Sequence, residues 1–320
     1  MRPFDLTAPT TVEDALGSSG TFLAGGTTLV DLMKLDVMTP RHVLDINALP
    51  LRGIDTSDGL RIGALERMSD VAEHPGVYPM ISRALLLSAS QQLRNMASIG
   101  GNLLQRTRCT YFRDVATPCN KREPGSGCPA ISGANRMHAV LGTSDQCVAT
   151  HASDVAVALV ALDAEVRLVS ATGTRTVKLA EFYRLPGDTP EVENDLRSGE
   201  LITEVLVPRL DWASRSTYVK VRDRQSYEFA LCSAAVALDI QGSRVADARV
   251  AVGGVGTVPW RLPAVEAALR GLPATLASFE DAASVAADGA RSLSANGFKV
   301  SLLKRTVVRA LLELTEGSRQ

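Results

Sequence analysis

The chain has 320 residues, of which 45% are hydrophobic and 22% are charged, a composition typical of a globular protein with room for two domains. Lys and Arg number 34 against 35 Asp and Glu, so no general attraction to nucleic acid or to a membrane surface is expected. Aromatic residues make up 4%, too few for a base-stacking platform, and no apolar stretch reaches the ~18 residues of a membrane-spanning helix.

The first part of the chain predicts short helices that alternate with strands. Thr11 is suited to cap the first helix, and Ser153 is suited to cap a helix that begins at Asp154. Apolar side chains at helical or alternating spacing give the other elements. The expected helices are 12–19, 27–35, 81–95 and 154–162, and the expected strands are 21–24, 42–46, 59–64, 164–170, 174–179 and 201–207.

The second part has a different order of elements. Pro208 and the polar residues 209–215 mark the expected domain boundary. Three strands come first and three helices follow, which predicts a small α+β domain with a three-stranded antiparallel sheet covered by helices. The expected strands are 218–222, 229–240 and 244–255, and the expected helices are about 262–271, 277–291 and 299–316.

Two glycine pairs are candidate anion-binding turns. Gly25-Gly26 leads from a strand into a helix, and Gly100-Gly101 follows a helix. Backbone N–H groups and a positive helix end at such turns suit a phosphate group, although the same turns are commonly structural. Neither pair matches the GxGxxG or Walker A pattern. Two such loops in one domain could hold the two ends of a long anionic cofactor.

Two charged positions have a structural and a functional interpretation. Asp154 follows its capping serine at a helix start, where the helix dipole favours a carboxylate. The same carboxylate could accept hydrogen bonds from cofactor hydroxyl groups. Lys220 belongs to an alternating strand pattern that is typical of a solvated face. Cys232 lies in an apolar strand and is expected in the core.

The other four cysteines lie within 39 residues, in the irregular segment 104–148. Nine, eight and eighteen residues separate them, which matches neither zinc-finger pairs nor ferredoxin runs. Four thiolates suit either tetrahedral zinc or a cubane [4Fe–4S] cluster, whereas disulfides are disfavoured because the N-terminus has no apolar export signal. The cations expected to offset thiolate charge are Arg106, Arg108, Arg113, Lys121, Arg122 and Arg136.

Taken in order, LAGGTTLVDLMK, ASIGGNLLQ, HASDVAVAL and YVKVRDRQSYEFA resemble the FAD-binding subunits of the xanthine oxidoreductase and carbon monoxide dehydrogenase family. The resemblance implies an α+β fold, with a vanillyl-alcohol-oxidase (PCMH)-type FAD-binding domain over 1–210 and a CO-dehydrogenase-flavoprotein-like domain over 215–320. The cysteine segment, about 104–148, is an insert in the first domain. The FAD-binding positions that the resemblance implies are Leu23, Ala24, Gly25, Gly26, Thr27, Thr28, Leu29, Ser98, Gly100, Gly101, Asn102, Asp154, Ile202 and Lys220.

The insert resembles more closely the FAD subunits of periplasmic aldehyde oxidoreductases, through NLLQRTRC and PCNKREPGSGC and through the cysteine that precedes THASD. In those subunits the insert holds a [4Fe–4S] cluster. The resemblance therefore implies that Cys109, Cys119, Cys128 and Cys147 are its ligands. Ala152 departs from the usual motif, which has proline there.

The resemblance implies electron transfer with no substrate chemistry on this chain. A large partner with a molybdenum cofactor would oxidise an aldehyde to a carboxylic acid, and a small partner with two [2Fe–2S] clusters would pass electrons to FAD here. FAD would then reduce an external acceptor. Two alternatives stay open: the same subunit in an N-heterocycle (xanthine- or nicotine-type) hydroxylase, and a zinc-stabilised, non-catalytic assembly protein. With no visible signal peptide, the expected location is the cytoplasm, or the periplasm after co-export with a signal-bearing partner.

Overall fold

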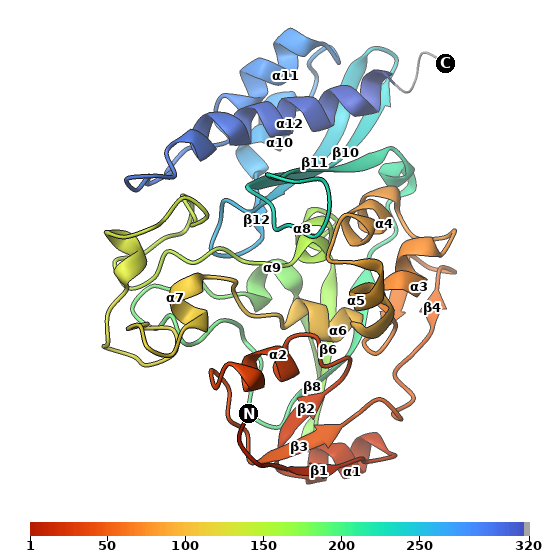
Figure 1. Ribbon diagram of the computed structural model, residues 1–320. Coiled ribbons are helices and arrows are strands. Elements are labelled where there is room, and N and C mark those ends of the chain that lie inside the picture. The colour runs from red at the N-terminus through yellow and green to blue at the C-terminus, as the bar shows by residue number, and fades with distance from the viewer. Residues whose placement is uncertain (317–320) are drawn as a thin grey trace.

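Three β-sheets organise the computed structural model, which describes residues 1–316 (Figure 1). The last four residues of the expected second domain lie outside the described residues. A parallel sheet has the order β1-β3-β2, an antiparallel sheet has the order β4-β5-β8-β6-β7, and a second antiparallel sheet has the order β12-β11-β10-β9. The strands are β1 (Asp5–Thr7), β2 (Thr21–Leu23), β3 (His42–Asp45), β4 (Ile54–Asp55), β5 (Leu60–Gly63), β6 (Glu165–Ser170), β7 (Gly173–Lys178), β8 (Leu201–Val207), β9 (Ser216–Val221), β10 (Cys232–Gln241), β11 (Arg244–Gly253) and β12 (Trp260–Arg261).

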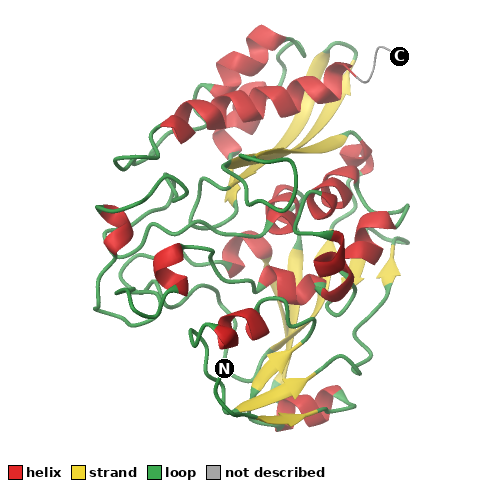
Figure 2. Ribbon diagram, in the orientation of Figure 1, coloured by secondary structure: helices red, strands yellow, loops and turns green. Residues whose placement is uncertain are grey.

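Short helices connect these sheets, and the long helix α12 closes the described part of the chain (Figure 2). The helices are α1 (Val12–Gly17), α2 (Leu29–Lys34), α3 (Met68–Glu73), α4 (Pro79–Leu86), α5 (Gln91–Met96), α6 (Ile99–Leu103), α7 (Thr110–Arg113), α8 (Asp154–Ala161), α9 (Leu179–Phe182), α10 (Pro263–Leu269), α11 (Leu276–Ala283) and α12 (Phe298–Glu316), with the 3-10 turns η1 (Pro129–Ile131) and η2 (Asp211–Ser214). Within residues 1–316, no helix combines the length and the apolar character that a membrane crossing requires.

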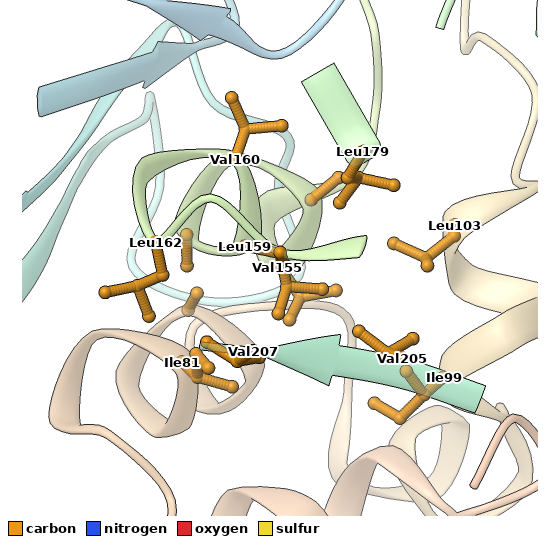
Figure 3. Packing of buried hydrophobic residues seen from close by; sticks show 14 of the residues in the cluster. Ile81, Ile99, Leu103, Val155, Leu159, Val160, Leu162, Leu179, Val205 and Val207 are labelled. Atoms are coloured by element: carbon orange, nitrogen blue, oxygen red, sulfur yellow. The ribbon is translucent and has the colours of Figure 1, made fainter. Parts of the chain in front are cut away.

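Helix α8 is the centre of the first hydrophobic core. All its residues are buried, which explains why its sequence is apolar on every side. Figure 3 shows Val155 and Leu159 among side chains from other elements, including Ile81 of α4 and Val205 of β8. The buried helix therefore holds its own first residue, Asp154, at a fixed place inside the protein.

The sheet β12-β11-β10-β9 separates two cores. Ala235 and Ala237 of β10 belong to the core around α8, whereas Val236 and Leu238 belong to a second core with α10, α11 and α12. This follows from the alternation of side chains along a strand. The sheet has four antiparallel strands, so the expected three are wrong in number. Strand β12 has two residues, too few to show an alternating pattern in the sequence.

The expected helix over 81–95 is wrong as a single helix. The chain forms α4 and α5 instead, with Ala89 between them in a left-handed conformation at φ 48°. The Ser90 hydroxyl accepts a hydrogen bond from the Leu93 N–H and so begins α5. The break matters because it directs Ser88 toward the first residue of α8. The expected helix over 277–291 also ends early, at Ala283.

The insert has little regular structure, as expected for 104–148: it contains only α7 and the turn η1 (Figure 2). Side chains hold it in place. Within the insert, Arg122 donates to the carbonyl oxygens of Tyr111 and Phe112 at 2.9 and 2.7 Å. Toward the first domain, Arg113 donates to Asp31 at 2.8 Å. Toward the second domain, the buried Asn135 accepts a hydrogen bond from the Ala295 N–H at 2.9 Å. The insert is therefore packed against both parts of the chain.

Candidate functional site

The two glycine pairs meet at one cavity of about 430 Å³. It lies between β2, α2, α6 and the start of β8. Of the positions implied to bind FAD, ten line this cavity: Ala24, Gly25, Gly26, Thr27, Thr28, Leu29, Ser98, Gly100, Gly101 and Ile202. Leu23 lies in β2 and packs against a small apolar cluster with Leu29, and it lines none of the cavities described here.

The glycines of the two loops serve different purposes. A Cβ at Gly25 would lie 1.9 Å from the Met96 carbonyl oxygen. Glycine is therefore needed at this position, because the first loop packs directly against the backbone that precedes the second glycine pair. Gly26 has φ 71°, a conformation that L side chains rarely adopt. A Cβ at Gly101 would meet only the Ser98 hydroxyl within 4 Å. Gly101 is therefore the position at which backbone, without a side chain, borders open space.

The second glycine pair lies in a helix, where the sequence suggested a loop. Ser98 caps α6 by accepting a hydrogen bond from the Gly101 N–H at 3.2 Å. The Asn102 side chain then accepts a hydrogen bond from the Ser153 hydroxyl at 2.6 Å. This contact joins the second glycine loop directly to the start of α8, across 51 residues of sequence.

A second cavity, of about 250 Å³, continues from Thr27 and Thr28 to Asn102, Asp154 and Lys220. Here Asp154 accepts three hydrogen bonds from side chains: Ser88 at 2.9 Å, Tyr218 at 2.7 Å and Lys220 at 2.7 Å. The side chain of Lys220 is 1% exposed and that of Asp154 is 7% exposed. The solvated strand face considered for Lys220 is therefore wrong.

Burial and the Asp154 charge raise the pKa of Tyr218 well above its usual value, so its hydroxyl stays protonated and donates. Tyr218 and Ser88 were not among the predicted site residues. The alternation Tyr218-x-Lys220 placed both side chains on one face of β9, but only the packing of β9 against α4 turned that face inward. A buried ammonium group that is paired with a carboxylate thus lies at the wall of the second cavity.

All four insert cysteines line one small cavity, together with Phe112 and His138. They are free thiols. Burial raises the pKa of the Cys109 thiol to about 11 and also raises the pKa values of Cys128 and Cys147. Backbone N–H groups oppose this shift: those of Tyr111 and Phe112 point at Cys109, and the Ala149 N–H donates to Cys147 at 3.5 Å. N–H groups directed at sulfur favour the thiolate form.

The four thiols share one small cavity, of about 10 Å³. Within residues 1–316, no three His, Cys, Asp or Glu side chains are placed to hold a single metal ion. Four thiolates suit either tetrahedral zinc, with Zn–S bonds of about 2.3 Å, or a cubane iron–sulfur cluster, so the donor set is compatible with both kinds of group.

Most of the cations expected to offset thiolate charge are paired with carboxylates. Arg106 and Lys121 contact Glu193, Arg108 and Arg113 contact Asp31, and Arg136 contacts Asp223. Only Arg122, of these six, has no carboxylate partner among the described residues. These five cations share three carboxylates, so two of their charges are left uncompensated, and Lys121 acts to lower the pKa of the Cys147 thiol. The offset of thiolate charge by the six cations stays a prediction.

His138 is a neighbour of the cysteines that the sequence did not reveal. Its Nε2 atom lies 3.2 Å from the Cys109 Sγ atom, and the side chain is buried. It is the one histidine within 104–148, but a separation of 29 residues from Cys109 matches no known motif that would have linked the two residues in the sequence. Residues Cys109 and His138 also line a third cavity, of about 320 Å³, which extends to Asp154.

Comparison with known proteins agrees with this architecture. The FAD binding domain in molybdopterin dehydrogenase matches residues 2–210, and the CO dehydrogenase flavoprotein C-terminal domain matches residues 217–314. The aldehyde oxidoreductase FAD-binding subunit of Escherichia coli is 49% identical over 91% of this chain and 90% of its own length. The glyceraldehyde dehydrogenase medium chain of Sulfolobus acidocaldarius is 34% identical over 76% and 71%.

Among solved structures, carbon monoxide dehydrogenase from Hydrogenophaga pseudoflava has a chain of the same fold, with a TM-score of 0.74, 25% identity and 98% coverage of both chains. The resemblance drawn from the ordered motifs and the expected fold class are confirmed, apart from the fourth strand. The chain belongs to the family of FAD-binding subunits of the molybdopterin dehydrogenases, which are oxidoreductase subunits of molybdenum hydroxylases.

Proposed function

We propose that this chain holds FAD and a [4Fe–4S] cluster and transfers electrons within a multi-subunit molybdenum enzyme that oxidises aldehydes to carboxylic acids. The observation that carries the proposal is the gathering of four free thiols around one cavity of the insert. The insert also borders the cavities of about 250 and 320 Å³, which share Asp154 and are called the flavin-side cavities below. The similarity of the chain to an aldehyde oxidoreductase FAD-binding subunit then favours a cluster over a single zinc ion.

The chain's residues divide the binding of FAD between two cavities. The N–H groups of the two glycine loops line the cavity of about 430 Å³ and suit the pyrophosphate. Asp154 holds Lys220 at the wall of the cavity of about 250 Å³, and because the ammonium group donates to Asp154 and to the Leu87 carbonyl, its third N–H is the one that would donate to the flavin. FAD, when bound, supplies the redox chemistry that no side chain offers: uptake of electrons in pairs and their release singly.

The proposed cluster ligands are Cys109, Cys119, Cys128 and Cys147. Each iron of a cubane takes one thiolate, so the sulfurs are spread around the cluster rather than drawn to one centre. Backbone N–H groups that point at Cys109 and Cys147 suit thiolate ligands, since hydrogen bonds to the sulfurs are a regular feature of such sites.

Relatives support the choice of substrate and partners. Both relatives described above act, by their names, on aldehydes, which favours an aldehyde over an N-heterocycle. A medium chain implies larger and smaller partners, for which we propose a molybdenum-cofactor subunit and a subunit with two [2Fe–2S] clusters. An external acceptor would take electrons from FAD. Co-export with a signal-bearing small subunit would place the complex in the periplasm.

A visible absorption spectrum with metal and flavin analysis tests the proposal. For the complex we expect flavin bands near ~450 nm, a broad iron–sulfur shoulder near ~400 nm and about eight iron atoms per FAD, four from the [4Fe–4S] cluster and four from the two [2Fe–2S] clusters of the partner. About four iron atoms per FAD would contradict the cluster on this chain and leave the family assignment intact. A colourless protein with one zinc per chain would contradict the proposed electron-transfer role altogether.

A further inference from the structure

The contact between His138 and Cys109 has the geometry of a hydrogen bond from a ring nitrogen to a sulfur atom. The Nε2–Sγ distance is 3.2 Å, and the histidine is 5% exposed. Its other ring nitrogen, Nδ1, is buried and has no hydrogen-bond partner among the described residues. A metal-bound thiolate can only accept, so Nε2 carries the proton whenever Cys109 is a ligand. The sulfur is then the single polar partner of this ring.

The backbone around His138 is anchored on both sides, which fixes the direction of the ring. The His138 N–H donates to the Asn135 carbonyl oxygen at 2.9 Å. The His138 carbonyl oxygen accepts from the Asn296 side chain at 3.3 Å, and the preceding carbonyl, of Met137, accepts from the Lys299 ammonium group at 3.0 Å. Asn296 and Lys299 are both 0% exposed. The second domain thus positions His138 through buried side chains.

The same pair of residues separates two cavities. Cys109 and His138 line both the small cysteine cavity and the cavity of about 320 Å³. The latter shares Arg108, Asp154 and Phe229 with the flavin-side cavity of about 250 Å³. Of the four cysteines, Cys109 alone lines the cavity of about 320 Å³, so it faces the flavin side.

We propose that His138 is a positioning residue that donates its Nε2–H to the Cys109 thiolate and thereby raises the reduction potential of the cluster at its flavin-facing ligand. The inference rests on the proposed [4Fe–4S] cluster. Reduction adds one electron and therefore one negative charge, which is shared with the thiolate ligands. A hydrogen bond to a more negative sulfur is stronger, so it stabilises the reduced form more than the oxidised form.

The test is a redox titration of the purified complex, followed by electron paramagnetic resonance of the reduced cluster. His138→Leu is expected to lower the ratio of reduced to oxidised cluster about tenfold at a fixed applied potential, which is 59 mV for a one-electron couple. Iron content and the flavin potential should stay at their wild-type values. His138→Gln should recover part of the shift, because its amide can donate.

His151→Leu is the matched control. This histidine also lines the cavity of about 320 Å³, but its ring packs edge-on against Tyr183 with centroids 4.5 Å apart. It should leave the cluster potential unchanged. An equal fall in this variant would overturn the proposal, since the cause would then be a general change in polarity. An unchanged potential in an iron-replete His138→Leu would also overturn it.

Two further outcomes are separable. If His138→Leu loses its iron, the wild-type protein labelled with 15N-histidine decides: a hyperfine coupling of histidine nitrogen to the reduced cluster supports the proposal, and its absence overturns it. A wild-type complex with only about four iron atoms per FAD, the content of the two [2Fe–2S] clusters, would overturn the proposed cluster and, with it, this inference. The iron analysis therefore distinguishes failure of the proposed function from failure of the role of His138.

Discussion

The hydrogen-bond network around Asp154, called the flavin-side network below, and the cysteine insert both bury polar groups. Only the network around Asp154 finds hydrogen-bond and charge partners for its carboxylate within the chain. Asp154 accepts hydrogen bonds from Ser88, Tyr218 and Lys220, so its charge is compensated within the chain. The insert thiols meet backbone N–H groups and one histidine, and burial keeps the pKa values of three of them above the ordinary range. The first site is complete from side chains, whereas the thiols of the second would become thiolates only with added positive charge, which the proposed cluster would supply.

The two regions also differ in how they are built. The flavin-side network joins α4, α8 and β9, elements that are held by the first hydrophobic core. The insert has two short helical turns and depends on side-chain contacts such as Arg122 with backbone carbonyls. A metal group that binds all four thiols would therefore contribute directly to the stability of the insert, because binding and ordering are coupled. The predictions below address this difference.

Loss of one proposed ligand should have the largest effect. Cys119→Ser is expected to remove the iron of the [4Fe–4S] cluster, about half of the iron of the complex, because one corner of the cluster loses its thiolate. FAD should stay bound, since the cavity of the glycine loops contains none of the cysteines. Iron and flavin analysis of the purified complex measures both.

Cys232→Ala is the control, because it removes a buried thiol of β10 that lies outside the insert. It should keep its full iron content. Joint loss of iron and FAD in Cys119→Ser would show that the insert holds the flavin site in shape, contrary to the separation described here.

Removal of Asp154 should be the next largest effect. Asp154→Ala leaves the Lys220 ammonium group buried without its carboxylate, which costs about 3–5 kcal/mol of the free energy of unfolding. Urea denaturation measures the loss. Asp154→Ala combined with Lys220→Met should recover part of it, because the unpaired charge is gone. If the free energy of unfolding of Asp154→Ala lies within about 1 kcal/mol of the wild-type value, the Lys220 charge does not depend on the Asp154 carboxylate for its compensation.

Lys299 is a buried cation with no carboxylate partner among the described residues, and it ties the insert to the second domain through the carbonyls of Met137 and Gly254. Burial lowers its pKa from 10.5 to about 8. Between these values the unfolded chain binds more protons than the folded one, so the lysine's contribution to stability rises with pH in this window.

The measurement compares wild type with Lys299→Met by urea denaturation at pH 7.5 and at pH 10. We expect the stability of wild type relative to the variant to rise by about 2 kcal/mol over this interval. The difference between the two proteins cancels the titration of the thiols. A difference that is independent of pH would mean that Lys299 titrates in the folded protein as it does in water.

Asp31 joins the two regions and should give the smallest effect. It pairs with Arg108 and Arg113 of the insert at 3.0 and 2.8 Å, and mainly the Arg113 hydrogen bond holds its pKa below the usual value. Because its side chain is 35% exposed, Asp31→Asn should cost about 1 kcal/mol at pH 7. The lowered pKa means that this contribution is lost as the pH falls below about 4, when the carboxylate becomes protonated.

Asp36→Asn is the matched control for Asp31→Asn. Asp36 is an exposed aspartate with φ 56°, which asparagine tolerates, and its one ion pair is with the N-terminus. It should be neutral in urea denaturation. Equal losses in the two variants would show that the Asp31 pairs contribute nothing specific to the junction.

The spacing of apolar and capping residues along the chain predicted most helices and strands correctly. It failed for elements whose bounds depend on contacts with distant parts of the chain. The capping residues Thr11 and Ser153 and the hairpin of β6 and β7 agree with the structure. The break at Ala89 and the strand β12 did not follow from the sequence, since a left-handed residue and a two-residue strand leave no periodic signal. The domain boundary at 209–215 stays a prediction, with Ala213 of this stretch buried in the first core.

The sequence by itself determined the family, through the order of the glycine pairs and the Ser153-Asp154 motif, and it determined that four thiols share one segment. Only the tertiary structure decided which groups face one another: Lys220 and Asp154 across 66 residues, and His138 and Cys109 across 29. The reason is that spacing along the chain fixes which face of an element a side chain occupies, whereas the packing of whole elements decides what that face meets.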